Sequence, residues 1–196
     1  MSINSRSVKM ILVGLLAMVV LPVGAQTQTS EQAISTALKT RQPLDVVNAF
    51  LMNTAPDKVS SAAQQLVAPD ATYISLNFNN PELKKIEPWA GTSKGPEAFV
   101  STFSRVAKYW KIVDFTVEDI FASGDNVAVF GNFTYRSTGI GKQFNSPFSI
   151  HAKVKAGKIT YFQFMEDTYA SASSFRVSGD WEVKTDPDGA SYRVGE

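Results

Sequence analysis

The sequence predicts an α+β domain in which three helices pack against a curved, mostly antiparallel sheet. Two observations carry this prediction. Up to Trp110, apolar residues recur at spacings of three and four, as in amphipathic helices. From Phe115 onward they alternate, in four stretches separated by the turns "SGD", "TGIGK" and "AGK". Helices followed by an antiparallel meander indicate one sheet that buries a face against those helices.

Composition narrows the class of protein. The chain has 196 residues, 44% hydrophobic and 19% charged, which suits one globular domain with a core. Lys and Arg total 19 against 18 for Asp and Glu, without a basic stripe, so we expect no nucleic-acid partner. There is no cysteine and one histidine, His151, so we expect no disulfide, no metal site and no cofactor.

The first residues predict a secretory signal peptide, residues 1–25. The basic start "RSVK" precedes the apolar run "MILVGLLAMVVL" and the small-residue site "VGA". The run is about 12 residues long, whereas a spanning helix needs about 20. We therefore expect cleavage after Ala25, a periplasmic or secreted protein, and no membrane attachment afterwards. Residues 26–42 are predicted to be a polar leader, 43–180 the domain, and 181–196 a tail.

Helices are predicted at three places. The first is "QPLDVVNAFLMNT", with proline suited to its first turn, and the second is "TAPDKVSSAAQQLV", with Thr54 as the expected N-cap. The third is "GPEAFVSTFSRVAKYW", whose apolar stripe runs along one face. Between the second and third helices, "DATYISLNF" predicts a strand and "EPWAGTSKG" a loop.

Four strands are predicted after the third helix: "FTVEDIFAS", "NVAVFGNFTYRS", "FNSPFSIHAKV" and "KITYFQFMEDT". The tail "WEVKTDPDGASYRVGE" predicts a short strand that fades into disorder. Between the last two long strands, the turn "KAG" predicts a three-residue loop ending in a glycine bulge. Its register pairs Val154 with Lys158, Ile150 with Phe162, Phe148 with Phe164, Ser146 with Glu166, and His151 with Tyr161. The first four pairs share one face of the sheet, and His151 lies on the other. If the turn has two residues instead, this register shifts by one.

The element order, with "PWAGTSKGPEAF", "ASGDNVAVFGNFTY" and "AGKITYFQFMED", resembles the nuclear transport factor 2-like superfamily, in its SnoaL-like and ketosteroid-isomerase-like branch. The resemblance covers roughly residues 43–170. It implies a cone-shaped domain in which the helices and the concave face of the sheet enclose a pocket, often in a homodimer. It also implies that catalytic members place polar groups on the concave face.

The catalytic sets that the resemblance implies are missing from this chain. Steroid isomerases have an aspartate base, an oxyanion-hole aspartate and a tyrosine where this chain has Ser75, Ile150 and Val47. The superfamily's epoxide hydrolases have charged residues where it has Phe148, Ile150 and Phe164. Scytalone-dehydratase-like members need two histidines. The resemblance alone therefore assigns no reaction.

Candidate site residues come mainly from the concave face. We expect a ligand pocket lined by Tyr73, Trp89, Val129, Phe133, Tyr135, Phe148, Ile150, Phe162 and Phe164. Glu166 is the candidate catalytic residue, because burial near the strand end would raise its pKa and suit it to proton transfer. Its alternative role is a carboxylate at the pocket rim or a helix cap. Asp167 points outward, where a structural hydrogen bond is expected.

Three functions remain open. The favoured one is an exported, homodimeric protein that binds a small apolar molecule without catalysis. The second is an isomerase, lyase or cyclase that uses Glu166 with Tyr73 or Tyr135 as a donor. The third is an association domain whose pocket is filled core. An empty apolar cavity favours the first, a polar group deep in the cavity the second, and the absence of a cavity the third.

Overall fold

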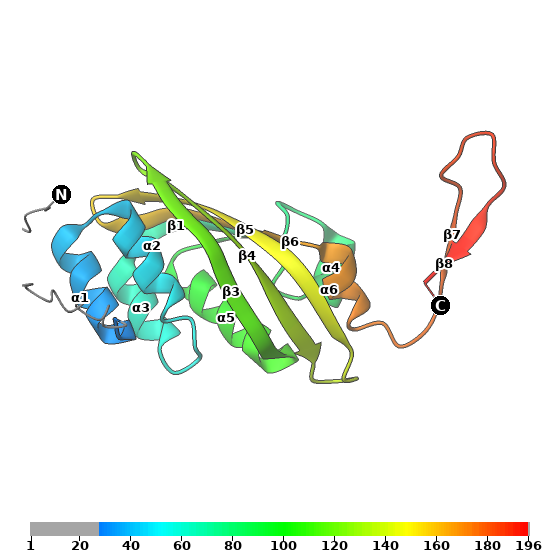
Figure 1. Ribbon diagram of the computed structural model, residues 1–196, viewed down its shortest axis with the longest axis horizontal. Helices are drawn as coiled ribbons and strands as arrows, with labels where there is room; N and C mark the ends of the chain where they lie inside the picture. The colour runs from blue at the N-terminus through cyan, green and yellow to red at the C-terminus, as the bar shows by residue number, and fades with distance from the viewer. Residues whose placement is uncertain (1–27, 196) are drawn as a thin grey trace, which may run out of the picture.

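A six-stranded sheet curves around three helices that lie on its concave face (Figure 1). The computed structural model describes residues 28–195. The predicted signal peptide and its cleavage site lie outside these residues. Within residues 28–195, none of the helices combines the length and apolar character that a membrane span requires. The architecture confirms the predicted α+β class with a mostly antiparallel sheet.

The helices on the concave face are α2 (Pro43–Leu51), α3 (Val59–Leu66) and α5 (Pro96–Tyr109), close to the three that were predicted. A fourth, α1 (Ser30–Thr40), packs against α2. It lies in the stretch predicted to be a polar leader, where no helix was predicted. The helix buries only Ala33 and Ala37 and depends on a capping box at its start, a local signal that its low hydrophobicity obscures.

Two short helices were not predicted. Helix α4 (Pro81–Ile86) begins after Asn80, whose side chain accepts the Leu83 N–H, and α6 (Thr168–Ser173) begins after Asp167. Asp167 Oδ1 accepts the N–H groups of the second and third residues of α6 at 3.1 and 3.0 Å, which is the structural role expected for it. By contrast, Thr54 does not cap α3; its hydroxyl donates to the Leu51 carbonyl instead.

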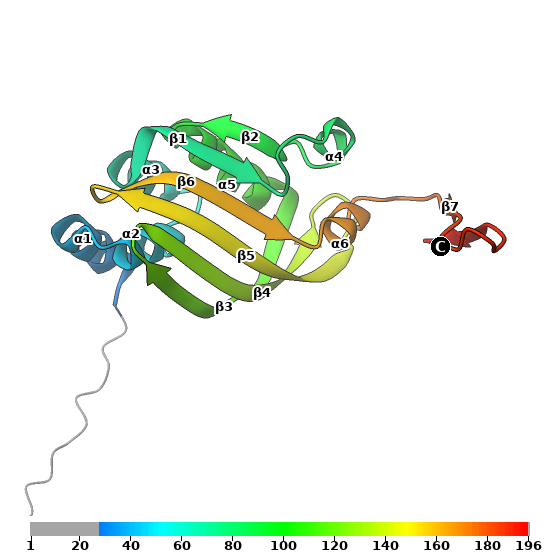
Figure 2. The same cartoon turned by 90° about the horizontal axis from the view of Figure 1, so that it is seen from above.

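The sheet has the order β2-β1-β6-β5-β4-β3 (Figure 2). Its strands are β1 (Val67–Ser75), β2 (Gly91–Lys94), β3 (Trp110–Ser123), β4 (Asn126–Ser137), β5 (Gln143–Lys155) and β6 (Lys158–Glu166). The last four form the predicted antiparallel meander. Strand β1 runs parallel to β6, and β2 occupies part of the stretch predicted to be a loop.

The register of the β5–β6 hairpin differs from the prediction. The turn has two residues, Ala156 and Gly157, both with positive φ (50° and 79°), so Lys155 pairs with Lys158. One further residue, Thr160, bulges out of β6. The observed pairs are therefore Ile150 with Phe164, Phe148 with Glu166, and His151 with Gln163. Beyond the bulge the two one-residue changes add to a shift of two, so those side chains keep their predicted faces. Between the turn and the bulge the shift is one, so Lys158, predicted to lie opposite Val154, lies on the other face, opposite Lys155.

His151 lies on the convex face, half-buried, with Nε2 3.0 Å from Asn126 Oδ1 and its ring 5.4 Å from that of Tyr161. We expect His151→Ala to lower the free energy of unfolding by only about 1 kcal/mol, the net contribution of one hydrogen bond. Ile150→Ala, next to it on the concave face, should cost about 2–5 kcal/mol because it leaves a cavity. Urea unfolding of both variants checks this, and equal losses would contradict the assignment of faces.

The chain ends in a small separate sheet of β7 (Trp181–Val183) and β8 (Tyr192–Val194), which stands away from the main sheet (Figure 1). The prediction of one short strand fading into disorder is therefore wrong in its second half. The Trp181 ring meets Tyr169 of α6 edge-on at 5.5 Å. This contact links the terminal hairpin to α6, and the cavity described below lies elsewhere.

Candidate functional site

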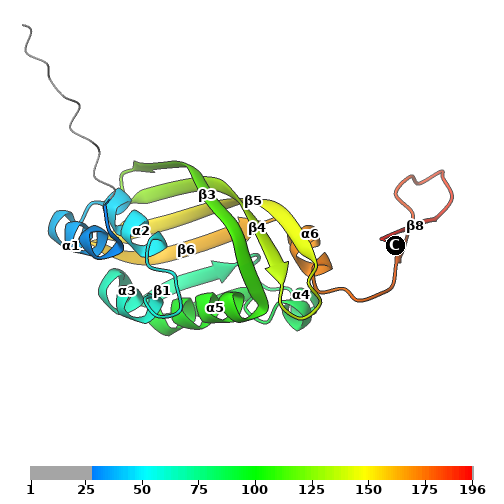
Figure 3. The same cartoon turned by 60° about the horizontal axis from the view of Figure 1, so that its bottom comes forward.

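A cavity of about 260 Å³ lies between the concave face of the sheet and the helices. Figure 3 shows α2, α3 and α5 on this side of the sheet. Its floor is buried and includes Tyr73, Ser75 and Trp110. Its mouth is marked by exposed residues, among them Pro56 between α2 and α3, and Ile112 on β3. Most of its lining is apolar, and its polar side chains include Thr54, Ser75, Thr102, Tyr73, Tyr135 and Glu166.

The structure brings six of the ten predicted site residues to this cavity: Tyr73, Trp89, Tyr135, Ile150, Phe164 and Glu166. The other four, Val129, Phe133, Phe148 and Phe162, lie in the hydrophobic core and not on the cavity wall. They share the concave face with the lining residues, but other rings cover them. The Phe162 ring, for example, lies 5.9 Å from Phe50 and 5.6 Å from Phe99, which fill the space above it.

The opposite wall comes from residues that the prediction did not place in the site. Helix α5 contributes Phe103, Val106 and Ala107, and β3 contributes Ile112 and Phe115. The apolar stripe of α5 was visible in the sequence, but a stripe does not distinguish a residue that fills the core from one that faces a cavity. Strand β3 lies at the edge of the sheet, and its position opposite α5 depends on the curvature of the whole sheet.

Glu166, the last residue of β6, places a carboxyl group in the cavity wall. Its Oε1 is buried and has no hydrogen-bond partner among residues 28–195. Burial, and then the nearby Glu87 carboxyl, raise the pKa of Glu166 to about 8. Burial also raises the pKa values of Tyr73 and Tyr135, and the charge of Glu166 adds to both. The cavity therefore presents a protonated carboxyl and two phenol O–H groups at neutral pH.

A second buried acid, Glu87, was missed because it lies in the stretch predicted to be a loop. It directly follows α4 and is 0% exposed. Neither of its carboxyl oxygens has a hydrogen-bond partner in the described part of the chain. Burial raises the pKa of Glu87 to about 7, and the Ser171 hydroxyl, which lies beside both carboxyl groups, opposes the rise at each. The local sequence gave no periodic signal that could have revealed this burial.

These raised pKa values predict a pH-dependent stability. A carboxyl group with a pKa near 4.5 unfolded and about 7 folded binds its proton more tightly in the folded state. The free energy of unfolding should therefore be highest below about pH 4.5 and fall as pH rises to about 8, by roughly 3 kcal/mol for Glu87. Urea unfolding at pH 5 and pH 8 measures this. Glu87→Gln should lose less stability over that range, and an unchanged loss would contradict the prediction.

The helices pack over the concave face of a curved sheet and enclose an apolar cavity with a buried acid. This arrangement defines a cone-shaped domain with a pocket. The fold is that of the nuclear transport factor 2-like superfamily. A family model described as "SnoaL-like domain" matches residues 49–162. The chain belongs to this SnoaL-like family, as the resemblance in its sequence implied.

Curated relatives come from two fungi. Patulin synthesis protein F of Aspergillus clavatus is 46% identical over 138 residues, which are 69% of this chain and 69% of that protein. Patulin biosynthesis cluster protein F of Penicillium expansum is 45% identical over 138 residues, with the same shares. Among solved structures, a nuclear transport factor 2-like protein of Burkholderia thailandensis has a TM-score of 0.59 at 22% identity, covering 70% of this chain and 99% of that one. TerC, co-crystallised with polyporic acid, has a TM-score of 0.54 at 20% identity, covering 68% and 98%.

Proposed function

We propose that the protein is a cofactor-independent acid–base enzyme of the isomerase, lyase or cyclase type, acting on a small, mainly apolar organic molecule. The observation that carries the proposal is the Glu166 carboxyl in the wall of an apolar cavity. A polar group at that depth favours an enzyme over the non-catalytic binder that the sequence alone favoured. The names of the two fungal relatives, both involved in making patulin, support a role in the synthesis of a small metabolite.

The chemistry follows from the protonation states. A carboxyl with a pKa of about 8 exists in both forms near neutral pH, so Glu166 can donate a proton to a substrate oxygen and can also accept one. Tyr73 and Tyr135 hold their phenol protons, so they can donate hydrogen bonds to an oxygen on which negative charge develops. The apolar walls strengthen these interactions because they keep water away from them.

The cavity also limits the substrate. Its volume of about 260 Å³ lies below the range of about 300–1,000 Å³ that is usual for sites of drug-sized ligands, so the substrate is smaller than those. Among the residues that line the cavity, none is a lysine, arginine or histidine that could pair with an anionic group. A neutral molecule with one or two oxygen atoms fits this lining best.

The test uses extract of a Penicillium expansum strain that lacks its patulin biosynthesis cluster protein F. The purified protein is added without cofactor, at a concentration far below that of the accumulated intermediate. Each protein molecule should convert several molecules of the intermediate, as measured by mass spectrometry. Multiple turnovers distinguish an enzyme from a binder. If a compound from the extract instead co-purifies unchanged with the protein, the binding function is correct; if nothing is converted or retained, a role in that synthesis is excluded.

Export and dimer formation remain part of the proposal. The signal-like start of the sequence supports secretion with cleavage after Ala25, and the exposed apolar residues of β3 support a homodimer. We expect secreted protein to begin at Gln26 and to have the mass of a dimer in solution. N-terminal sequencing and light scattering measure these two properties, and an intact Met1 or a monomer would contradict the respective expectation.

A further inference from the structure

We propose that Thr102 is a specificity-determining residue of the site, and that the substrate carries two oxygen atoms on opposite sides, one facing Thr102 and the other facing Glu166. The inference rests on the proposed function and names the class of substrate more closely: a small neutral molecule with hydrogen-bond acceptors at both ends. Thr102 lies on α5, whereas Glu166 is the last residue of β6. The two side chains therefore reach the same cavity from its helix wall and from its sheet wall.

The first support is the position of Thr102 in an apolar wall. The residues of α2 and α5 that line the cavity are Leu51, Thr102, Phe103, Val106 and Ala107, and Thr102 is the polar member of this set. It is 5% exposed, whereas Phe103 and Val106 on the same wall are only half-buried. A hydroxyl buried among apolar side chains is destabilising unless it finds a hydrogen-bond partner.

The second support is that the Thr102 hydroxyl lacks such a partner within residues 28–195. In this part of the chain, the α5 side chains that make hydrogen bonds are Ser101, to the Ala98 carbonyl at 3.3 Å, and Arg105, to the Pro88 carbonyl at 3.0 Å. A threonine inside a helix can bond the carbonyl four residues earlier, here that of Ala98, but Thr102 does not. Its hydroxyl is therefore available to a molecule in the cavity.

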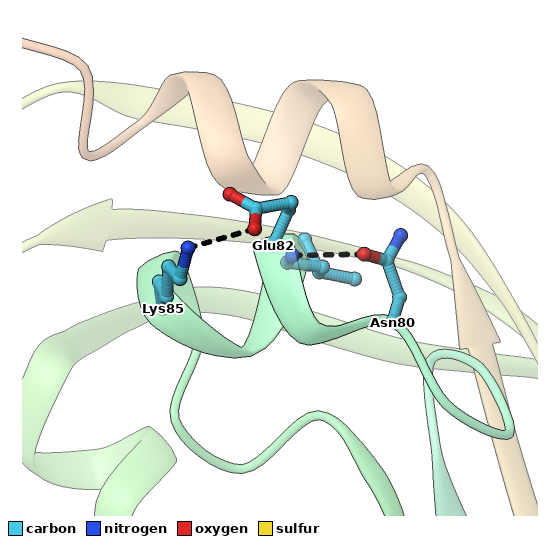
Figure 4. A network of polar contacts seen from close by, with 4 residues as sticks. Asn80, Glu82 and Lys85 are labelled. Atoms are coloured by element: carbon cyan, nitrogen blue, oxygen red, sulfur yellow. Dashed lines mark hydrogen bonds and ion pairs between the residues drawn. The ribbon is translucent and has the colours of Figure 1, made fainter.

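Polar side chains at α4, by comparison, have partners. Asn80 Oδ1 accepts the Leu83 N–H at 3.0 Å, and the Lys85 ammonium lies 2.7 Å from the Glu82 carboxylate, as Figure 4 shows. Thr102 is buried and has no partner among the described residues, although burial makes a missing hydrogen bond more costly. An unpaired hydroxyl at this depth points to a partner that enters the cavity from outside.

The opposite wall carries a matching group. Oε1 of Glu166 is buried and has no hydrogen-bond partner in the described part of the chain. A protonated carboxyl and a threonine hydroxyl can each donate one hydrogen bond to an acceptor such as a carbonyl oxygen. A molecule with an oxygen at each end satisfies both groups at once, whereas a molecule with a single oxygen leaves one of them unpaired.

The test compares two ketones of similar size: cyclohexane-1,4-dione, with carbonyl groups at opposite ends, and cyclohexanone, with one. Binding to the protein is measured by NMR titration, which detects weak ligands. The protein should bind the dione about tenfold more tightly, the effect expected of one further hydrogen bond in an apolar site. Thr102→Val, which nearly keeps the shape and removes the hydroxyl, should abolish this difference.

Two variants serve as controls. Thr102→Ser keeps the hydroxyl and should retain the preference for the dione. Ser101→Ala removes a hydroxyl from the exposed side of the same helix, outside the cavity, and should also retain it. Equal binding of the two ketones by the unmodified protein, or an unchanged preference in Thr102→Val, would overturn the proposal.

The melting temperature without ligand separates this role from a structural one. Thr102→Val should leave it unchanged or raise it by about 2–4 °C, because an unpaired buried polar group is removed. A clear fall would show that the hydroxyl stabilises the fold through a partner in the protein, and the proposal would then be wrong.

With the accumulated intermediate as substrate, Thr102→Val should raise KM about tenfold and change kcat by less than about twofold, because the hydroxyl binds substrate and transition state alike. An unchanged KM would contradict the proposal. If Glu166→Gln retains full turnover while the preference for the dione still depends on Thr102, the proposed function fails and the recognition of two oxygen atoms stands.

Discussion

Replacing Glu166 by glutamine is expected to lower turnover by about 10²–10⁴ with the fold intact, the usual contribution of one general acid or base. Glutamine has nearly the same shape as a protonated glutamic acid and fills the same place in the cavity wall, but it cannot give up or accept the proton. Because Glu166 is largely protonated at neutral pH, the change removes little charge from the folded state. The melting temperature should therefore be preserved while activity is lost.

The assay is conversion of the accumulated intermediate by equal amounts of each variant. Glu82→Gln is the matched control, since Glu82 is an exposed glutamate on α4 that does not line the cavity. It should retain full activity. Retained turnover in Glu166→Gln would mean that Glu166 is a structural acid, and Tyr73 and Tyr135 would then be the first residues to examine for the proton transfer.

Phe162→Ala is expected to lower the free energy of unfolding by about 3–5 kcal/mol. The Phe162 side chain is fully buried, and its ring lies within 6 Å of those of Phe50, Tyr73 and Phe99, which come from α2, β1 and α5. Its removal leaves a cavity, and these three rings can fill it only by losing their own packing contacts. Guanidinium unfolding, followed by fluorescence and circular dichroism, measures the loss.

Phe130→Ala is the control for this change. Phe130 lies on the convex face of β4 and is 44% exposed. Among the described residues its aromatic partner is Phe121, in a stacked pair at 6.1 Å. Its loss should cost less than about 1.5 kcal/mol, the upper end for such an aromatic pair. A loss as large as that of Phe162→Ala would show that the exposed face of β4 is buried against another molecule in solution.

The parts of the structure that could be predicted are those that depend on periodicity. The spacing of apolar residues located α5 and the β4 strand, and the two-residue alternation placed Phe148, Ile150 and Phe162 on the correct face of the sheet. The pairing within the β5–β6 hairpin could not be predicted, because it depends on Thr160 leaving the ladder. A bulge changes no residue type, so the sequence pattern does not reveal it.

The candidate site was only partly predictable for a related reason. Whether a concave-face residue such as Phe164 lines a cavity or, like Phe162, fills the core is decided by what packs above it from α2 and α5. That is a long-range property. Glu87 shows the same limit more strongly, since a charged residue in a loop is ordinarily exposed. Glu87 is instead buried, beside Ser171 of α6, which lies more than eighty residues later in the chain.

The parallel pairing of β1 with β6 has a consequence for the order in which the protein folds. Val67 pairs with Ile159 and Ser75 with Phe164, so β1 must wait for the end of the meander before its hydrogen bonds to β6 form. Closing the long loop between β1 and β6 is slow, because the chain loses entropy before the stabilising contacts between the two strands form. On a ribosome, β1 can pair with β2 early, but its other edge should remain unpaired until β6 has emerged, exposed to aggregation and to chaperones. Glu166 is the last residue of β6, so its carboxyl should reach the cavity only when this late pairing forms.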